Sequence, residues 1–452
     1  MEGGYNMANF LEWSHAFTGR VSETDSQNLA KRAPELAEML KKGLTAGEMP
    51  FLSMPYRERL ERDMPPILER IAGIKNMLVL GIGGSALGAR AMQKAFAPGQ
   101  DEPGYGGPWL WIADNVGASQ FEAMLTKLSP AETVVVCISK SGGTIETLSQ
   151  YFLVRAWLMK GLGDNWASRM IVVTDASKGY LRQEAIDKSL ASLEVPDYLG
   201  GRYSALSAVG LLPAAFMGMD WKGFLDGASE VARPLVEQPE KIAEHPSFSL
   251  ACWAKDLEDK NYSELIFFCY IPQWAAYGQW FAQLWAESLG KSGKGSQPIP
   301  ATGVTDQHSI NQMFLDGPRN KGCIFVTGDQ PKSGRVFGQD LPQQWEWLKG
   351  KAFDTLLEAE GLGTRMALCQ SGVPLVNMHM ASLDERSAGQ MMLLLEAATV
   401  FTGWLMGINP VDQPAVELGK RLANTRLGSA GYAKEAADLA AFLAVPSKRQ
   451  TF

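Results

Sequence analysis

A run of small polar residues lies between an apolar stretch and a helix-like one at positions 139–144. Its hydroxyl groups, separated by glycines, could each donate to an oxygen of one phosphate group alongside backbone N–H groups. The start of a following helix adds partial positive charge at the same place. We therefore predict a phosphate monoester site, termed the 139–144 loop, made of Ser139, Lys140, Ser141, Gly142, Gly143 and Thr144.

A second glycine-rich turn, residues 81–88, also joins an apolar stretch to a helix-like one, and Gly84 and Ser85 could add donors to the same site. The turn alone is equally compatible with a tight strand-to-helix connection. It also fits the dinucleotide fingerprint G-x-G-x-x-A, with Asp114 in the place of the ribose-binding acid. The 139–144 loop favours the monophosphate, because a dinucleotide site requires no hydroxyl-rich loop two strands later.

Candidates for proton transfer and charge stabilisation follow in the middle of the chain. Arg202 follows two glycines, which free the backbone to aim a permanently charged guanidinium at an oxyanion, although it could instead cap a surface helix. Gln283 and Glu287 are four residues apart and would share one face of a helix that is otherwise rich in aromatic residues. On such a face Glu287 could act as a general base, or it could be a solvated residue at the helix end.

Two later segments carry weaker candidates. His308 is one of four histidines and lies in a polar stretch, 305–312, although a lone histidine is more often structural. Gln413 and Lys420 lie in a loop and on the helix that Pro414 would begin, where a lysine could also be an ordinary cation on a solvated face. The histidines and cysteines lack the spacing of a metal site, so we expect no bound transition metal.

Apolar runs rich in β-branched residues alternate with segments long enough for helices, which predicts parallel sheets with helical crossovers. The predicted fold class is α/β, with two doubly wound parallel-sheet domains and flanking N- and C-terminal helices. The first set of strands is expected at 77–80, 110–112, 133–138 and 170–174, and the second at 265–271, 323–327 and 373–378.

The expected domain limits follow from these two sets. Two apolar stretches, 205–219 and 391–408, should be buried helices, since the first is too short to span a bilayer and the second carries Glu396. We predict an N-terminal helical segment over 1–50 packing on the second domain, a first sheet domain over 51–225, a second over 226–425 and a C-terminal helix over 426–452.

The composition, with 46% hydrophobic residues and a net charge of −7 over 452 residues, is that of a soluble globular protein without the basic face that nucleic acid requires. Five dispersed cysteines without a C-x-x-C motif indicate free thiols in a reducing compartment. A basic stretch followed by an apolar leader is not apparent at the N-terminus. We therefore expect a cytoplasmic protein that has no membrane partner.

The two loops resemble those of the sugar-isomerase (SIS) domain, a doubly wound α/β unit that binds phosphosugars. The ordered motifs between positions 77 and 420 are similar to those of the glucose-6-phosphate isomerase family, in its compact bacterial form. The matching motifs are GIGGS, SKSGGT, GGRYS, Q-x-x-x-E-S-x-GK, Q-H-x-x-x-Q and Q-x-x-x-E-L-GK.

The resemblance implies reversible isomerisation of glucose 6-phosphate to fructose 6-phosphate, a step of glycolysis and gluconeogenesis, through ring opening and a cis-enediol, without a cofactor. It implies that Glu287 is the base, that Arg202 stabilises the enediolate, and that His308 and Lys420 open the ring. Gln283 and Gln413 would line the sugar site. The family resemblance also implies a homodimer in which His308 reaches the site of the neighbouring subunit.

One residue departs from the family pattern. Many members have threonine where this chain has Gly143, so the 139–144 loop has fewer hydroxyl groups. Phosphate affinity, and not the reaction, is the property that this change puts in doubt.

Three other functions stay open at this point. An isomerase of a related sugar phosphate would share the loops, although we would not expect it to carry all the later motifs together. A phosphosugar-binding regulator would also share the loops, but the presence of Glu287, His308 and Lys420 favours an enzyme. A dehydrogenase would share the glycine fingerprint and would bind nicotinamide.

Overall fold

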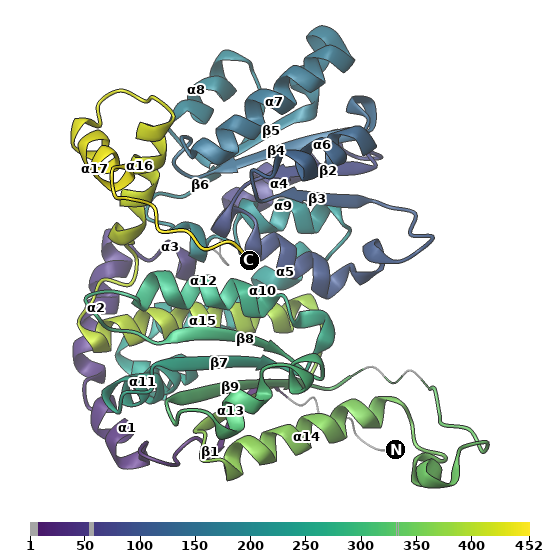
Figure 1. The fold of residues 1–452 in the computed structure, drawn as a ribbon, viewed down its shortest axis with the longest axis vertical. Helices are drawn as coiled ribbons and strands as arrows, with labels where there is room; N and C mark the ends of the chain where they lie inside the picture. The colour runs from purple at the N-terminus through teal and green to yellow at the C-terminus, as the bar shows by residue number, and fades with distance from the viewer. Residues whose placement is uncertain (1–7, 54–57, 331, 333) are drawn as a thin grey trace. The chain divides into compact units, whose positions relative to one another are not determined.

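The computed structural model describes residues 8–53, 58–330, 332 and 334–452. The chain divides into a large compact unit that ends at Pro410 and a smaller unit, Val411–Phe452. Both predicted sheets lie in the large unit (Figure 1). The domain limits near residues 50, 225 and 425 stay predictions.

The first sheet contains five parallel strands among the described residues, in the order β3-β2-β4-β5-β6. Four of these strands match the predicted ones within a residue or two, because long runs of Val, Ile and Leu fill their buried positions. The fifth, β6, is short and mixed in polarity, and the sequence analysis missed it. The strands are β2 (Asn76–Leu80), β3 (Trp109–Ala113), β4 (Thr133–Ser139), β5 (Met170–Asp175) and β6 (Ala191–Val195).

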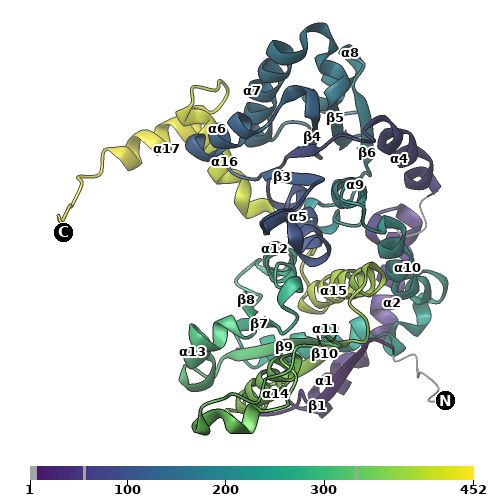
Figure 2. The ribbon, with the colours of Figure 1, turned by 90° about the vertical axis from the view of Figure 1, so that its right-hand side faces the viewer.

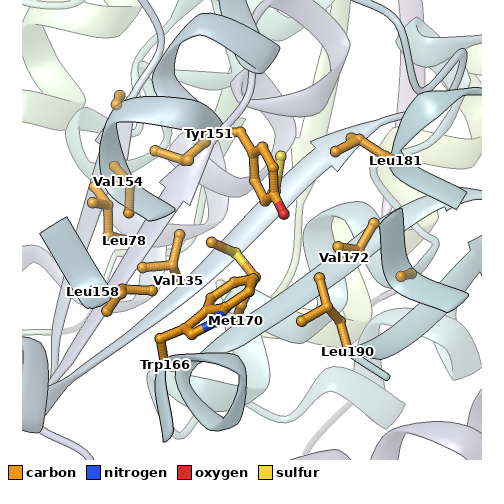
Figure 3. Close-up of a cluster of buried hydrophobic side chains, with 14 of the residues drawn as sticks. Leu78, Val135, Tyr151, Val154, Leu158, Trp166, Met170, Val172, Leu181 and Leu190 are labelled. Atoms are coloured by element: carbon orange, nitrogen blue, oxygen red, sulfur yellow. The ribbon is translucent and has the colours of Figure 1, made fainter. Parts of the chain in front are cut away.

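Helices cover both faces of this sheet (Figures 1 and 2). One face carries an apolar cluster in which Tyr151, Val154 and Leu158 of α7 pack on Val135 and Val172 of the sheet (Figure 3). The helices on this face are α6 (Ala118–Lys127), α7 (Ile145–Leu162) and α8 (Tyr180–Asp187). Those on the other are α4 (Glu58–Arg70), α5 (Leu87–Phe96) and α9 (Ala208–Phe216).

The second sheet has the order β1-β10-β9-β7-β8 among the described strands. Four of its strands are parallel, and β1 runs antiparallel to β10 at one edge. The strands are β1 (Phe10–His15), β7 (Glu264–Cys269), β8 (Gln297–Thr302), β9 (Lys321–Gly328) and β10 (Leu375–Met380).

Two strands of this sheet were not predicted. Residues 1–50 were expected to be helical, and for Phe10–His15 this was wrong, because the segment pairs with β10 as an edge strand in which no side chain is fully buried. The other missed strand, β8, contains Pro298 and Pro300, which usually argue against a strand. Both prolines are tolerated because β8 lies at the opposite edge, where one side of the strand needs no ladder hydrogen bonds.

Four strands of each sheet share one topology. The order β3-β2-β4-β5 corresponds to β8-β7-β9-β10, but the fifth position differs, because β6 follows β5 and runs parallel to it, whereas β1 precedes the other described strands in the chain and runs antiparallel to β10. In each sheet the next strand along the chain after β2 or β7, namely β3 or β8, lies on one side of it. The strand after that, β4 or β9, lies on its other side. The predicted fold class, α/β with two parallel-sheet halves and flanking helices, is therefore confirmed.

The helices of the second half lie on both sides of its sheet (Figure 2). The long helix α15 is buried along most of its length and packs against α10, α11 and α12. Among the described residues, no helix is both long and apolar enough to cross a membrane. The helices are α1 (Glu23–Ala30), α2 (Ala33–Ala46), α3 (Pro50–Ser53), α10 (Trp221–Glu237), α11 (Pro246–Asp259), α12 (Tyr277–Leu289), α13 (Asn311–Asp316), α14 (Asp354–Gln370) and α15 (Glu385–Met406).

The smaller unit contains two helices among its described residues, α16 (Glu417–Arg426) and α17 (Ala433–Leu443), which pack against each other. A short 3-10 turn, Pro414–Val416, precedes α16, in agreement with the predicted helix start at Pro414. Arg421 of α16 and Glu435 of α17 form an ion pair of 2.8 Å that joins the two helices.

Two leucines of α7 test the role of the apolar cluster of the first half. Leu158 is fully buried in the cluster, whereas Leu153 on the same helix is 56% exposed. We expect Leu158→Ala to lower the free energy of unfolding by about 2–5 kcal/mol, because it removes buried methyl groups and leaves a cavity. Leu153→Ala should change it by no more than about 0.5 kcal/mol. Denaturant unfolding of both variants measures the difference, and equal losses would contradict this account of the cluster.

Candidate active site

Helix α12 carries the predicted base on its polar face. Its aromatic and leucine side chains, including Trp280 and Trp285, are buried, while Gln283 and Glu287 are only partly covered. Gln283 Nε2 donates a hydrogen bond of 2.9 Å to Glu287 Oε1. The prediction that these two residues share one helical face is confirmed, and the hydrogen bond orients the carboxylate.

Arg202 is placed by two turns that touch each other. It lies in the 3-10 turn Gly201–Tyr203, which packs against the 3-10 turn Gly83–Ser85 after β2. A Cβ atom on Gly84 would lie 2.3 Å from the carbonyl oxygen of Gly201, so only glycine permits this approach. The glycine that was predicted as a phosphate ligand therefore also sets the position of the arginine backbone.

The guanidinium of Arg202 is buried and extensively hydrogen-bonded. Its Nε donates to Ser288 Oγ at 2.7 Å, and its Nη2 donates to the carbonyl oxygen of Pro410 at 2.6 Å. Its Nη1 lies 3.4 Å from Glu287 Oε2, with the arginine side chain 1% and the glutamate side chain 31% exposed. A permanent positive charge thus lies beside a carboxylate that is accessible from one side, which is an arrangement suited to proton abstraction next to an oxyanion.

The 139–144 loop brings its three hydroxyl groups together. Ser139 Oγ lies 2.9 Å from Thr144 Oγ1, and Ser141 Oγ lies 3.5 Å from each of the other two oxygens. Thr144 is the N-cap of α7, whose side chain caps no backbone N–H, so the free N–H groups of that helix begin at the loop. Hydroxyl groups that converge at a helix N-terminus are able to bind an anion, and the phosphate site stays a prediction.

Strand β5 holds this loop in place. The hydroxyl of Thr174 donates to the carbonyl oxygen of Ser139 at 2.6 Å, and the backbone N–H of Asp175 donates to that of Lys140 at 3.1 Å. Gly142 has φ of +63°, and a Cβ there would lie 3.1 Å from Cα of Gly179. Both the positive φ and the close contact with Gly179 require a glycine at position 142. Gly142 therefore helps to fix the conformation of the loop.

Gly143 differs from Gly142 in both respects. Its φ is not in the left-handed region, and an added Cβ would meet only the carbonyl oxygen of Ser141, at 3.9 Å. The position where the family commonly has threonine therefore has room for a side chain. Lys140 beside it is partly buried, and burial lowers the pKa of its ammonium group while the carboxylates of Asp197 and Asp175 oppose the shift.

The two glycine-containing loops leave neighbouring strands. In the parallel ladder Leu80 of β2 lies opposite Cys137 of β4, so the turn with Gly84 and Ser85 and the 139–144 loop emerge at the same edge of the sheet. Asp114, the acid of the dinucleotide alternative, forms an ion pair of 2.8 Å with Arg90 of α5. That carboxylate is therefore already engaged within its own half of the fold.

The predicted histidine lies in a turn that follows β8. His308 ends the 3-10 turn Thr305–His308 and is exposed, and no hydrogen bond links it to Glu287 or Arg202 within the described residues. Its polar neighbours stabilise the turn itself, since Asp306 accepts hydrogen bonds from the N–H of Thr302 and from Ser309 Oγ. The polarity of this stretch thus has a structural cause.

Gln413 and Lys420 belong to the smaller unit. Lys420 lies on α16, where its ammonium group contacts Glu417 Oε1 at 2.7 Å. Gln413 is the N-cap of the turn before α16, so both residues lie where the sequence predicted a loop and a helix. Their participation in the site of Glu287 stays a prediction.

The sequence analysis did not single out the groups that hold Arg202. Ser288 Oγ contacts both Arg202 Nε and, at 2.9 Å, the hydroxyl of Tyr203, which in turn donates to the carbonyl oxygen of Pro410 at 3.2 Å. Ser288 and Tyr203 lie directly beside Glu287 and Arg202 in the sequence. Their adjacency to predicted residues was the available signal, but only the fold shows that their side chains meet.

Two surface cavities lie away from these residues. They have volumes of about 680 and about 550 Å³ and follow β1 and β10 of the second sheet, and neither is lined by a predicted site residue. The candidate site is therefore identified by its converging hydrogen-bond donors and its carboxylate, and not by either of these cavities.

Comparisons with known proteins find relatives along most of the chain. A sequence model of the phosphoglucose isomerase family matches residues 69–330. A glucose-6-phosphate isomerase from Rubrobacter xylanophilus is 36% identical over 439 residues, which cover 95% of this chain and 98% of the relative. One from Carboxydothermus hydrogenoformans is 32% identical and covers 91% of this chain and 92% of the relative.

Solved structures show the same fold. A hypothetical protein from Thermus thermophilus superposes with a TM-score of 0.82 at 30% identity, over 93% of this chain and all of that one. A glucose-6-phosphate isomerase from Chlamydia trachomatis superposes with a TM-score of 0.79 at 21% identity, over 96% of this chain and 92% of that one. Since the family pattern covers more than half of its length and the relatives match it almost from end to end, the chain belongs to the phosphoglucose isomerase family.

Proposed function

We propose that this protein is an isomerase that interconverts glucose 6-phosphate and fructose 6-phosphate. The observation that carries the proposal is the pairing of an accessible carboxylate, Glu287, with the buried guanidinium of Arg202 at 3.4 Å. The family membership and the relatives named glucose-6-phosphate isomerase support it. A regulator that binds a phosphosugar without catalysis is not favoured.

In the proposed mechanism Glu287 moves one proton between neighbouring carbons. After the sugar ring opens, the carboxylate of Glu287 takes the proton from C2 of the aldose, the C–H electron pair forms the C1–C2 double bond of a cis-enediolate, and the π pair of the C1 carbonyl moves onto O1. The hydroxyl proton of O2 is then transferred to O1, the C2–O2 double bond forms, and the electron pair of the C1–C2 double bond takes the proton back from the carboxyl group to C1, which completes the ketose. Gln283 donates to Oε1 and so holds the carboxylate in one orientation throughout both transfers.

Arg202 stabilises the negative charge that develops on the sugar oxygen. Its guanidinium cannot lose its proton near neutral pH, so it acts by charge and hydrogen bonding alone. Because its position is fixed by Ser288 and by the carbonyl of Pro410, little reorganisation is needed when the charge forms. His308 and Lys420 open the ring in this proposal, and Gln413 contacts the sugar.

The 139–144 loop and the turn with Gly84 and Ser85 bind the phosphate group of the substrate. The three hydroxyls of the loop lie within 3.5 Å of one another, and the helix that follows, α7, contributes its N-terminal N–H groups. A phosphate that is anchored there fixes one end of the sugar and leaves the reacting carbons for Glu287.

We further propose that the protein works as a homodimer in which His308 completes the site of the partner subunit. The apolar side chains of Ile310 and Met313, near His308, are exposed, which supports an interface with another protein chain at this surface. More of them occur on α14 and on the segment before it, and these are Val336, Trp345, Trp347, Phe353, Leu356, Leu362 and Met366. A second copy of this chain is the occupant that we propose for this apolar surface.

We place the enzyme in the cytoplasm. Its five cysteines are free thiols, which suits a reducing compartment.

The role of Glu287 is tested by Glu287→Gln, which keeps the shape of the side chain and removes its basicity. We expect kcat for fructose 6-phosphate conversion to fall by about 10²–10⁴-fold, as for the loss of a general base. Competitive inhibition by inorganic phosphate should persist, because the 139–144 loop is untouched. A coupled assay measures both.

The matched control is Glu122→Gln on the exposed surface of α6, which should leave kcat unchanged. If Glu287→Gln retains the activity of the wild type, the proposed base is wrong.

Phosphate affinity is tested at Gly143. Gly143→Thr should fit without strain and add a hydroxyl donor, which lowers KM and strengthens inhibition by inorganic phosphate by up to about tenfold, or about 1.4 kcal/mol, with kcat little changed. Gly142→Ser, one position earlier, should instead weaken phosphate binding, because that residue has φ of +63° and contacts Gly179. Steady-state kinetics measures KM and the inhibition by phosphate for both variants. Equal changes in the two variants would contradict phosphate binding by the 139–144 loop.

Subunit sharing is tested by mixing two inactive variants, His308→Ala and Glu287→Gln, and refolding them together. Half of the dimers would then be hybrids, and each hybrid has one site with both residues intact if His308 acts across the interface. We expect about a quarter of the wild-type activity to return. A site formed within one subunit would give no recovery, since every chain then lacks one of the two residues.

A further inference from the structure

The lysine that ends the motif Q-x-x-x-E-S-x-GK has no part in the mechanism proposed above. Lys291 follows Gly290, the C-cap of α12, and is partly buried. Its ammonium group donates one hydrogen bond of 2.7 Å to the carbonyl oxygen of Ser288 and another of 2.7 Å to the carbonyl oxygen of Asn409. The first carbonyl belongs to the last turn of α12, and the second belongs to the segment after α15. Lys291 therefore ties the end of the helix that carries Glu287 to a segment that is distant in the sequence.

The two segments that Lys291 joins are the ones that hold Arg202. Ser288 accepts a hydrogen bond from Arg202 Nε through its hydroxyl oxygen, at 2.7 Å, and one from Lys291 through its carbonyl oxygen. Pro410, the neighbour of Asn409 in the chain, accepts from Arg202 Nη2 at 2.6 Å. A closed circuit of hydrogen bonds thus runs from Arg202 through Ser288, Lys291 and the Asn409–Pro410 pair back to Arg202.

The chemistry of lysine suits this place in the circuit. The carbonyl groups in the last turn of a helix have no partner inside the helix, and a cation interacts favourably with the partial negative charge there. An ammonium group carries three donors, so it can bind two carbonyl oxygens at once, and hydrogen bonds from a charged donor are stronger than neutral ones. Without this ammonium group, the Ser288 and Asn409 carbonyls lose their common donor.

We propose that Lys291 is a positioning residue for the isomerisation, which holds the Ser288 and Pro410 acceptors at a fixed separation and thereby sets the place of the Arg202 guanidinium. Arg202 Nη1 lies 3.4 Å from Glu287 Oε2, so a shift of the acceptors changes the position of the positive charge relative to the base. Lys291 acts through backbone carbonyls and needs no contact with the substrate. This inference rests on the proposed role of Arg202 in isomerisation.

Lys294 provides a matched control. It lies in the same loop after α12, and its ammonium group donates to the carbonyl oxygen of Met406, the last residue of α15, at 2.6 Å. Met406 is outside the circuit that contains Arg202. If a lysine in this loop only stabilises a helix end, its loss should have the same effect at both positions. If Lys291 positions Arg202, only the loss of Lys291 should affect the reaction.

Steady-state kinetics of three variants tests the proposal. Lys291→Met keeps the length of the side chain and removes its charge and donors. We expect kcat to fall by at least about tenfold with KM within about twofold, because a displaced Arg202 affects the transition state most. Lys291→Arg keeps donors for two carbonyls and should restore most of the lost kcat. Lys294→Met should have a kcat within about twofold of the wild type.

Two competitive inhibitors separate a displaced Arg202 from a general loss of structure. The hydroxamate 5-phospho-D-arabinonohydroxamate carries a planar anionic group in place of the enediolate, whereas sorbitol 6-phosphate has the phosphate on an uncharged open chain. We expect Lys291→Met to weaken inhibition by the hydroxamate by at least about tenfold and inhibition by sorbitol 6-phosphate by less than about twofold. A purely structural role would change the two inhibition constants equally.

The inference is overturned if folded Lys291→Met keeps the kcat of the wild type, if Lys294→Met loses as much kcat, or if the two inhibitors lose affinity equally. Should Lys291→Met not fold, Lys291→Gln, which keeps a polar side chain too short to bridge both carbonyls, takes its place. A wild type without isomerase activity would overturn the proposed function instead. A crystal structure of Lys291→Met then decides, since an Arg202 that still binds the carbonyl of Pro410 would contradict the positioning role.

Discussion

The burial of one guanidinium constrains most of the surrounding structure. Arg202 has 1% of its side chain exposed, so its charge and its donors must be satisfied by protein groups. Ser288 comes from α12, Pro410 from the segment after α15, and Glu287 from the polar face of α12. The arginine itself comes from the first half of the fold. A single side chain thus joins elements that are far apart in the sequence.

Close backbone packing makes this arrangement possible. The turn of Arg202 approaches the turn after β2 so closely that Gly84 has no space for a side chain. Gly88, one turn later, would bring a Cβ to 2.5 Å from Cβ of Ala205, which keeps α5 close to the start of α9. These small residues have a steric role that is separate from ligand binding. Replacing them would displace the arginine even if the phosphate loop were intact.

Much of the fold could be predicted because long apolar runs are unambiguous. The strands with uninterrupted Val, Ile and Leu, such as β4, and the polar face of α12 were both located from the sequence. The edge strands β1 and β8 were not, since one alternates in polarity and the other contains two prolines. Glu287, Arg202 and the 139–144 loop were singled out as candidates because motifs mark them, and their roles stay predictions. Ser288 and Tyr203 were not assigned a role, because their importance depends on contacts between segments that no local pattern reveals.

The shared topology of the two sheets gives helix α12 a counterpart. Helix α12 follows β7 through a short 3-10 turn, as α5 follows β2 through the turn with Gly84 and Ser85, and α12 packs against α5. Equivalent helices of the two halves thus pack against each other, and the first half supplies a backbone turn while the second supplies an acidic side chain. This is the pattern expected after a duplication in which the halves have diverged in role. Under the proposed function, the first half supplies the loops that bind the anionic end of the substrate and the second half supplies the base, so these two parts can change separately over evolutionary time.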